Sequence, residues 1–394
     1  QNNGNKLVSD NFDFAKRQMV HMLENIPQGE AKMPHSINGK GNTSCRSIYW
    51  WTSGFFPGIL WYINEYTGDK TFESFAKKWT EKLEPVKTFK GNHDIGFMMY
   101  CSFGNAYRLT QNEKYKDILI QSAYSLATRF NPQVGTIKSW DSWRSWENKH
   151  VFKYPVIIDN MMNLELLFWA SKATGDPSFR NIAISHAEKT MKYQIRKDGS
   201  SYHLACYDPE TGNFIKGETS QGYSNESTWS RGQGWGIYGF TLCYRETKDP
   251  RFLKTAQRMA DYYINHPNLP SDKIPWWDFD THRPGFIPGK FSKTNKYIQN
   301  YRDASAASVT ASALLELSSY VKDDKKKIYT ETALQILTSL SSPEYRAEEG
   351  KNGNFILKHS TGAIPHGSEV DVPLIYADYY FLEALLRYNR MINN

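Results

Sequence analysis

The fold is decided by residues 160–194, which read NMMNLELLFWASKATGDPSFRNIAISHAEKTMKYQ. Residues 160–173 are apolar nearly all round, as expected for a helix with packed neighbours on every side. The turn Thr174-Gly175-Asp176-Pro177 interrupts this pattern, and residues 179–194 then show the apolar and charged faces of an amphipathic helix. The stretch predicts a helical hairpin with a buried first helix and a second helix that faces the solvent.

The same hairpin recurs along the chain. Further copies are expected at residues 54–66 with 71–83, 95–109 with 115–129, 234–246 with 252–265, and 304–320 with 327–340. A first helix at 12–23 and a last helix at 374–391 could pair with each other. Inner and outer helices in this order predict an all-α (α/α)6 barrel, formed as a single domain over residues 1–394 with a frayed segment at 1–10.

An open α-solenoid built from the same hairpins is the alternative architecture. The closed ring is favoured because the last helix can complete the first. The long, aromatic and polar connectors between one hairpin and the next should also emerge at one end of such a ring. Loops held by a rigid scaffold are where function concentrates, so this end is expected to carry the site.

Composition narrows the class of protein. With 40% hydrophobic and 23% charged residues the chain is globular rather than disordered. The net charge of +7 suits a small acidic substrate, and no block of Lys and Arg indicates a nucleic-acid partner. The sequence contains no run of about 18 apolar residues, so no membrane span is expected. No metal and no cofactor are expected, because metal-ligand spacing is missing among the cysteines Cys45, Cys101, Cys206 and Cys243.

The start of the chain bears on its location. It begins at Gln1 rather than at a methionine, so a leader is expected to have been removed. This favours a periplasmic or exported protein, with a cytoplasmic location as the alternative. A monomer or weak dimer is expected.

Polar residues introduce each predicted inner helix. They are His93-Asp94, Asp159-Asn160, Arg231, Arg302-Asp303 and Asp371. If the inner helices run in the same direction, these side chains converge at one mouth of the ring. A pair of carboxylates facing a cavity is typical of glycosidic-bond chemistry.

Asp159 is the central candidate. It follows the apolar run Val156-Ile157-Ile158, and apolar surroundings favour the protonated form of a carboxyl group, which suits a general acid. The alternative is a plain helix N-cap that accepts backbone N–H groups. The nearby glycines of 232–236 do not follow a strand, so a dinucleotide site is excluded; we interpret them as letting Arg231 and Trp235 approach a ligand closely.

Six segments carry a resemblance to a known family. They are Trp51-Thr52-Ser53-Gly54-Phe55, Asn92-His93-Asp94-Ile95-Gly96-Phe97, Ile158-Asp159-Asn160-Met161-Met162-Asn163, Thr228-Trp229-Ser230-Arg231-Gly232-Gln233-Gly234-Trp235-Gly236, Asp303-Ala304-Ser305-Ala306-Ala307-Ser308 and Pro373-Leu374-Ile375-Tyr376-Ala377-Asp378-Tyr379-Tyr380. Taken together and in this order, they make the chain resemble the unsaturated glucuronyl hydrolases, glycoside hydrolase family 88.

The resemblance implies an (α/α)6 barrel that removes 4,5-unsaturated uronic acid from lyase-generated glycosaminoglycan oligosaccharides without a cofactor. Asp159 would be the general acid/base and Asp94 the second essential carboxylate. The residues expected to bind the sugar are His93, His203, Gln221, Arg231, Trp235, Trp51, Ser368 and one ring of the loop 140–146, for which Trp143 is chosen. Arg231 is the least ambiguous of them, because a buried arginine needs an anion and a uronate carboxylate is a bidentate match.

Several alternatives for the reaction and the substrate stay open. The family is understood to hydrate the C4=C5 double bond rather than attack the anomeric carbon. The alternatives are an unsaturated rhamnogalacturonyl hydrolase acting on pectin fragments, an inverting glycosidase acting on saturated sugars, and a sugar-binding module without activity. Some relatives carry Ser-x-x-Ser-x-Lys in the last loop, whereas this chain reads Pro365-His366-Gly367-Ser368-Glu369-Val370. The missing lysine disfavours 6-sulfated chondroitin units and favours heparin-type or unsulfated substrates.

Overall fold

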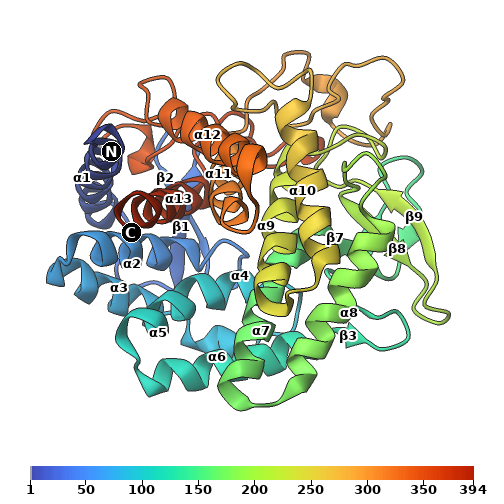
Figure 1. The fold of residues 1–394 in the computed structure, drawn as a ribbon, viewed down its shortest axis with the longest axis horizontal. Coiled ribbons are helices and arrows are strands. Elements are labelled where there is room, and N and C mark those ends of the chain that lie inside the picture. Colours follow the sequence, from blue (N-terminus) through green and yellow to red (C-terminus); the bar gives the residue numbers. More distant parts are fainter. Residues whose placement is uncertain (1) are drawn as a thin grey trace.

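Helical hairpins arranged as two concentric rings make up the computed structural model, which describes residues 2–394 (Figure 1). The inner ring contains α2 (Phe55–Thr67), α4 (Ile95–Met99) continuing through the π-helical η2 (Tyr100–Gly104) into α5 (Asn105–Thr110), α7 (Leu164–Thr174), α9 (Ser230–Thr247), α11 (Ala304–Ser318) and α13 (Ile375–Asn393). The outer ring contains α1 (Asn2–Glu24), α3 (Lys70–Glu81), α6 (Glu113–Ala127), α8 (Pro177–Tyr193), α10 (Pro250–Asn265) and α12 (Asp323–Leu340). The predicted (α/α)6 barrel is confirmed.

Four of the hairpin turns share one stereochemistry. In each turn, one residue adopts the left-handed backbone conformation. The side chain of the residue that follows it accepts a hydrogen bond from the backbone N–H two residues further on, which caps the outer helix. The left-handed residues are Gly68, Gln111, Gly175 and Lys248, and the caps are Asp69, Asn112, Asp176 and Asp249. These turns end each inner helix abruptly and start its outer partner in the antiparallel direction.

The ring is closed by the last helix. α13 packs against both α2 and α11 as well as against α1, and Asn393 Nδ2 donates a hydrogen bond to Asn5 Oδ1 at 3.0 Å. An open solenoid would leave α2 and α13 apart, so that alternative is wrong. The two ends of the chain lie close together in Figure 1.

The expected fraying of residues 1–10 is wrong within the part that the structure describes. α1 begins at Asn2, and Val8 is fully buried. Gly4 lies against the Tyr388 ring so closely that an added Cβ would come within 2.8 Å of its hydroxyl oxygen. Packing on α13 therefore orders this segment. Gln1 lies outside the described residues.

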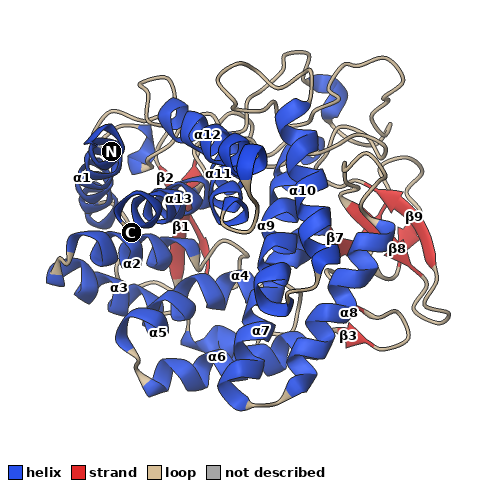
Figure 2. Ribbon diagram, in the orientation of Figure 1, coloured by secondary structure: helices blue, strands red, loops and turns tan. Residues whose placement is uncertain are grey.

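Short antiparallel sheets occupy the connectors (Figure 2). They pair β1 (Lys32–Ile37) with β2 (Thr43–Ser47), β3 (Phe130–Asn131) with β4 (Thr136–Ile137), β5 (Trp143–Arg144) with β6 (Val151–Phe152), and β8 (Leu204–Tyr207) with both β7 (Pro155–Ile157) and β9 (Phe214–Glu218). These strands were not predicted, because the connectors were expected to be loops. β7 leads directly into the 3₁₀ segment η3 (Ile158–Asn163), so the sheet fixes the position of Asp159.

The remaining short helical turns are η1 (Glu84–Thr88), η4 (Thr294–Lys296), η5 (Asn352–Asn354) and η6 (Ile364–His366). Between residues 2 and 394, none of the helices combines the length and apolar character that crossing a membrane requires.

The glycines near Arg231 serve helix packing. An added Cβ would come within 2.8 Å of the Trp229 ring at Gly232, 3.0 Å of Thr310 Oγ1 at Gly234, and 2.2 Å of Met259 Cε at Gly236. The interpretation that they let Arg231 and Trp235 approach a ligand closely stays a prediction. They let α9 lie close to its neighbours, with aromatic rings filling the centre of the barrel: Trp235 has its ring centroid 5.2 Å from Phe97 and 5.5 Å from Tyr380.

Candidate active site

The two predicted carboxylates lie where inner helices begin. Asp94 is the residue before α4, and Asp159 lies inside η3, which precedes α7. Neither side chain caps its helix; the N-cap of η3 is Ile157. Asp159 is only 6% exposed and its Oδ1 has no hydrogen-bond partner among the described residues. The N-cap alternative for Asp159 is therefore wrong, and its carboxylate is free for chemistry.

His203 faces Asp159. Its Nδ1 accepts hydrogen bonds from the backbone N–H groups of Ser220 at 3.0 Å and Gln221 at 3.2 Å, so the proton of the neutral ring must be on Nε2. That Nε2 lies 3.6 Å from Asp159 Oδ1. Burial lowers the pKa of His203, even though Asp159 acts in the opposite direction. A neutral imidazole thus points a single N–H at the buried carboxylate.

His93 and Asp94 form a second such pair. His93 Nε2 lies 3.0 Å from Asp94 Oδ1, and the histidine is completely buried. The segment carrying this pair is fastened to η3, because Asn163 Oδ1 accepts a hydrogen bond from the Phe97 backbone N–H at 2.9 Å. Gly96 makes this approach possible: an added Cβ would come within 2.3 Å of the same oxygen. Both carboxylates therefore belong to one rigid assembly.

Arg231 is buried at the same end of the barrel, but its anion is part of the chain. Its Nη1 donates to Asp303 Oδ2 at 3.2 Å and to the Thr361 carbonyl at 2.7 Å, and Nη2 donates to the Gly362 carbonyl at 2.9 Å. The guanidinium also lies over the ring of Trp229, 4.5 Å from its centroid. Asp303 therefore supplies one anion from within the chain, while Arg231 Nε has no hydrogen-bond partner among the described residues; a role of Arg231 toward a uronate stays a prediction.

The other predicted binding residues surround this group at different depths. Trp235 is fully buried and its Nε1 has no partner among the described residues. Trp51 is half-buried with its ring centroid 4.7 Å from that of Tyr376. Gln221 is half-buried and donates to the Gly362 carbonyl at 3.2 Å. Ser368 is half-buried on the last loop. Their roles toward a sugar stay predictions.

Two expectations fit the structure less well. Trp143 is 7% exposed and donates through Nε1 to Glu218 at 3.1 Å, so it is largely enclosed. Trp140 from the same loop is half-buried and its ring lies edge-on to His203, with centroids 6.5 Å apart. Asp371, expected at the mouth, is exposed and pairs with His359 at 2.7 Å.

Residues 25–244 match the family described as Glycosyl Hydrolase Family 88. An unsaturated glucuronyl hydrolase of Formosa agariphila is 46% identical over 343 residues, which are 87% of this chain and 80% of the relative. The chain belongs to glycosyl hydrolase family 88.

Further similarity covers the whole family 88 barrel. An unsaturated glucuronyl hydrolase of Bacillus sp. (strain GL1) is 34% identical over 372 residues, 93% of each chain. The crystal structure of an unsaturated glucuronyl hydrolase specific for heparin superposes with a TM-score of 0.89 at 45% identity, covering 99% of this chain and 98% of the other. The resemblance seen in the sequence is confirmed, and so is a glycosidase activity.

This family 88 chain places three residues at the site that the sequence analysis did not select. His366 lies 3.0 Å from Ser220 Oγ through its Nε2, and Trp140 faces His203. Glu369 lies 2.6 Å from His35 Nε2; burial alone would raise the pKa of Glu369, but the hydrogen bond and charge of His35 lower it overall. His366 is an isolated histidine in a polar loop, which forms no recognisable sequence pattern. Among these residues, only Trp140 belongs to a segment with a visible pattern, the tryptophan-rich loop 140–146.

A buried histidine behind the site makes stability depend on pH. His186 Nδ1 accepts the Ile137 backbone N–H at 3.0 Å, and burial lowers its pKa to about 3. The unfolded chain binds this proton near pH 6.5 and the folded chain does not, so folding stability falls as the pH drops below 6.5. Each pH unit costs roughly 1.4 kcal/mol from this group.

Replacing His186 with asparagine keeps an acceptor but removes the titration. We expect the unfolding free energy of the His186→Asn variant to fall about 2 kcal/mol less than that of the unchanged protein between pH 6.5 and 4.5. Urea denaturation at the two pH values measures this difference. Equal losses in both proteins would show that His186 is protonated in the folded chain.

Proposed function

We propose that this chain removes the 4,5-unsaturated uronic acid from glycosaminoglycan disaccharides by hydrating its double bond, with Asp159 as general acid and base. The observation that carries the proposal is a buried carboxylate with an unpartnered oxygen facing the Nε2–H of a neutral histidine. The names of the similar proteins support the substrate class.

The chemistry fits these groups. Protonated Asp159 gives its proton to C4 of the unsaturated sugar, and water adds at C5 while losing a proton to the same carboxylate, so one residue serves both transfers. The resulting hemiketal opens and the glycosidic link then breaks. Asp94, whose Oδ1 lies 3.0 Å from His93 Nε2, serves as the second essential carboxylate.

Isotope labelling tests this route. In heavy-oxygen water the label should enter at C5 of the released keto acid, and in heavy water deuterium should appear at C4. Mass spectrometry of early product, taken before exchange, measures both positions. A saturated glucuronide has no double bond to protonate and should be inert.

An inverting glycosidase predicts the reverse. Its product would carry oxygen label at C1 without deuterium at C4, and it would hydrolyse the saturated control. Label at C1 would rule out hydration and leave the family assignment intact.

The preferred substrate is proposed to be a heparin-type or unsulfated disaccharide. Two observations support it: the loop 365–370 lacks a lysine, and a structure described as specific for heparin is 45% identical. We expect kcat/KM for a heparin-type disaccharide to exceed that for the 6-sulfated chondroitin disaccharide by roughly tenfold, the effect of about one charge-assisted hydrogen bond. The loss of alkene absorbance across a matched panel of lyase products measures the ratio, and fastest turnover of the 6-sulfated chondroitin unit would contradict the preference.

A further inference from the structure

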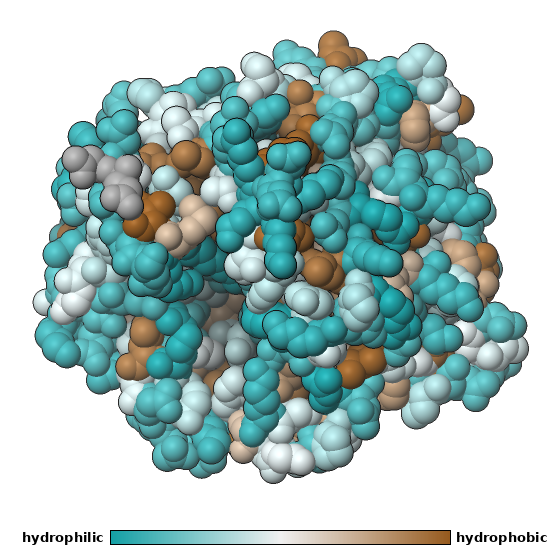
Figure 3. Space-filling view, in the orientation of Figure 1, coloured by the Kyte–Doolittle hydropathy of each residue, from teal (hydrophilic) through white to brown (hydrophobic). Residues whose placement is uncertain are grey.

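A cavity of about 710 Å³ opens at the end of the barrel opposite the catalytic carboxylates. Its walls are formed by α2, η2, α5, α7, α9 and α13, and Gly96, Phe97 and Met162 lie at its floor. Asp94 and Asp159 do not line it; they lie where inner helices begin. Figure 3 shows the face that carries the opening, hollowed near its centre. The packed rings of Phe97, Trp235 and Tyr380 separate the two ends, so this is not a branch of the catalytic site.

The charges of the cavity are already paired. Arg108 binds Glu65 through two hydrogen bonds of 2.7 and 2.8 Å, Arg245 binds Glu316 at 2.9 Å, and the remaining cationic lining residues also lie within 4.0 Å of a carboxylate: Lys172, Arg387 and Arg390. An anionic ligand would have to break one of these pairs and leave a carboxylate unpaired. The cavity therefore suits a neutral ligand.

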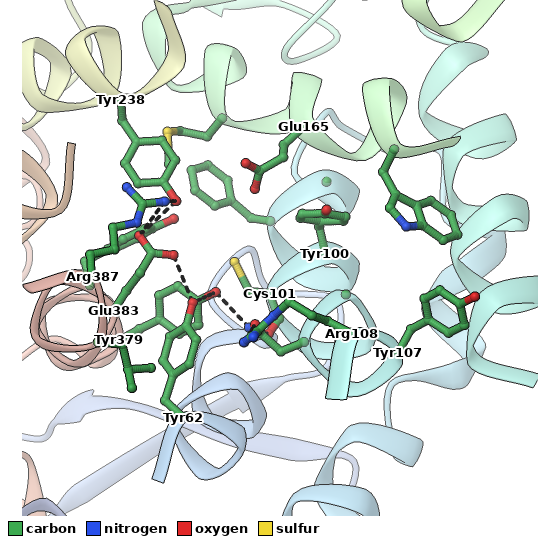
Figure 4. A pocket seen from close by; sticks show the side chains of 18 of the residues that line it. Tyr62, Tyr100, Cys101, Tyr107, Arg108, Glu165, Tyr238, Tyr379, Glu383 and Arg387 are labelled. Carbon is green, nitrogen blue, oxygen red and sulfur yellow. Dashed lines mark hydrogen bonds and ion pairs between the residues drawn. The ribbon is translucent and has the colours of Figure 1, made fainter. Parts of the chain in front are cut away.

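The polar groups on one wall of the cavity are hydrogen-bonded to one another, whereas several on the other wall are not (Figure 4). Tyr62 donates to Glu383 at 2.9 Å and its hydroxyl oxygen lies 2.8 Å from that of Tyr379, which closes one wall. On the opposite wall the polar tips of Tyr100, Tyr107 and Trp169 make no hydrogen bond to any described residue.

The unsatisfied wall is built around an irregular helix. Tyr100 begins the π-helical segment η2, and such segments occur frequently at functional sites. The rings of Tyr107 and Trp169 meet edge-to-face with centroids 5.8 Å apart. Glu165 contributes a carboxylate of which only one oxygen is engaged by an arginine, Arg245.

We propose that this cavity is a second saccharide site, which binds a neutral hexose or N-acetylhexosamine. Apolar ring faces beside hydroxyl, indole and carboxylate groups match the mixed apolar and polar faces of a sugar, and the volume is in the range of small-molecule pockets. The site is distinct from the catalytic centre and its occupation does not depend on the proposed hydration mechanism.

Calorimetric titration with N-acetylglucosamine tests the site, with glucuronate as the matched anionic probe. We expect the neutral sugar to bind and glucuronate to bind at least tenfold more weakly at this site. The Trp169→Ala variant should bind N-acetylglucosamine at least tenfold more weakly, and Tyr107→Phe, which removes one hydroxyl, about fivefold more weakly. Turnover of the unsaturated disaccharide should stay within about twofold in both variants.

The control is Tyr124→Ala, on the outer face of α6 where Tyr124 is 50% exposed; it should bind the sugar as the unchanged protein does. Thermal unfolding of each variant verifies folding, and Tyr107→Phe keeps the test valid if Trp169→Ala does not fold. Unaltered binding by the cavity variants would place the sugar elsewhere and overturn the proposal, as would failure to bind at about 50 mM sugar, which is weaker than the millimolar affinities of small ligands.

Discussion

Replacement of Asp159 by asparagine is expected to lower kcat on an unsaturated disaccharide by about a hundred- to ten-thousand-fold. Asparagine keeps the shape of the side chain and can still present an oxygen to His203 Nε2–H, which lies 3.6 Å from Asp159 Oδ1. It has no proton to give to C4 and cannot take one from water. We therefore expect the variant to bind substrate with nearly unchanged affinity while turnover collapses, as measured by alkene absorbance and by equilibrium binding.

Asp371→Asn is the matched control, because Asp371 also lies before an inner helix but is exposed and pairs with His359. Its kcat should remain within about twofold of the unchanged protein, as is usual for surface positions. Near-normal turnover by the Asp159 variant would show that Asp159 is not the general acid and base.

Arg231→Met should destabilise the folded chain by about 3–5 kcal/mol, the cost of leaving one member of a buried ion pair without the other. Asp303 is completely buried, and its Oδ2 faces Arg231 Nη1 at 3.2 Å. Its Oδ1 keeps hydrogen bonds from the backbone N–H and hydroxyl of Ser305, which do not neutralise the charge. Urea denaturation measures the loss.

The double variant Arg231→Met, Asp303→Asn separates structure from recognition. Replacing Asp303 removes the unpaired buried charge and should restore part of the lost stability, since asparagine still accepts the Ser305 hydrogen bonds. If Arg231→Met instead lost less than 1 kcal/mol of stability while KM rose a hundredfold, the sequence-based role of Arg231 as the uronate anchor would be favoured.

The barrel was predictable because its signals are local. Each hairpin turn carries its own left-handed residue and its own cap, as in Thr174-Gly175-Asp176, and each needs only neighbouring residues to form. The strands were missed because segments such as β5 and β6 have two residues each, which is too short for any alternation to show. The pairing of β7 with β8 joins two connectors that α7 and α8 separate in the chain, so no local signal could show it.

The site was predictable in its members but not in their partners. Asp94, Asp159 and His203 were chosen from motifs, and the structure places Asp159 beside His203. The partner of Arg231 could not be chosen in this way, because Asp303 lies far along the chain and the two meet only through packing of α9 on α11. The free side of the opposite cavity likewise depends on which tyrosines find partners, a property of the assembled ring.

Closure of the ring by α13 has a consequence for biosynthesis. This helix lies between α2 and α11 and packs on α1, yet it leaves the ribosome after the other helices of the ring. Until it does, the nascent chain exposes the apolar faces of α2 and α11 that α13 covers in the finished ring. Chaperones that hold apolar segments therefore have their opportunity on this chain until α13 has been made, and a stall before α13 leaves a product for proteolysis.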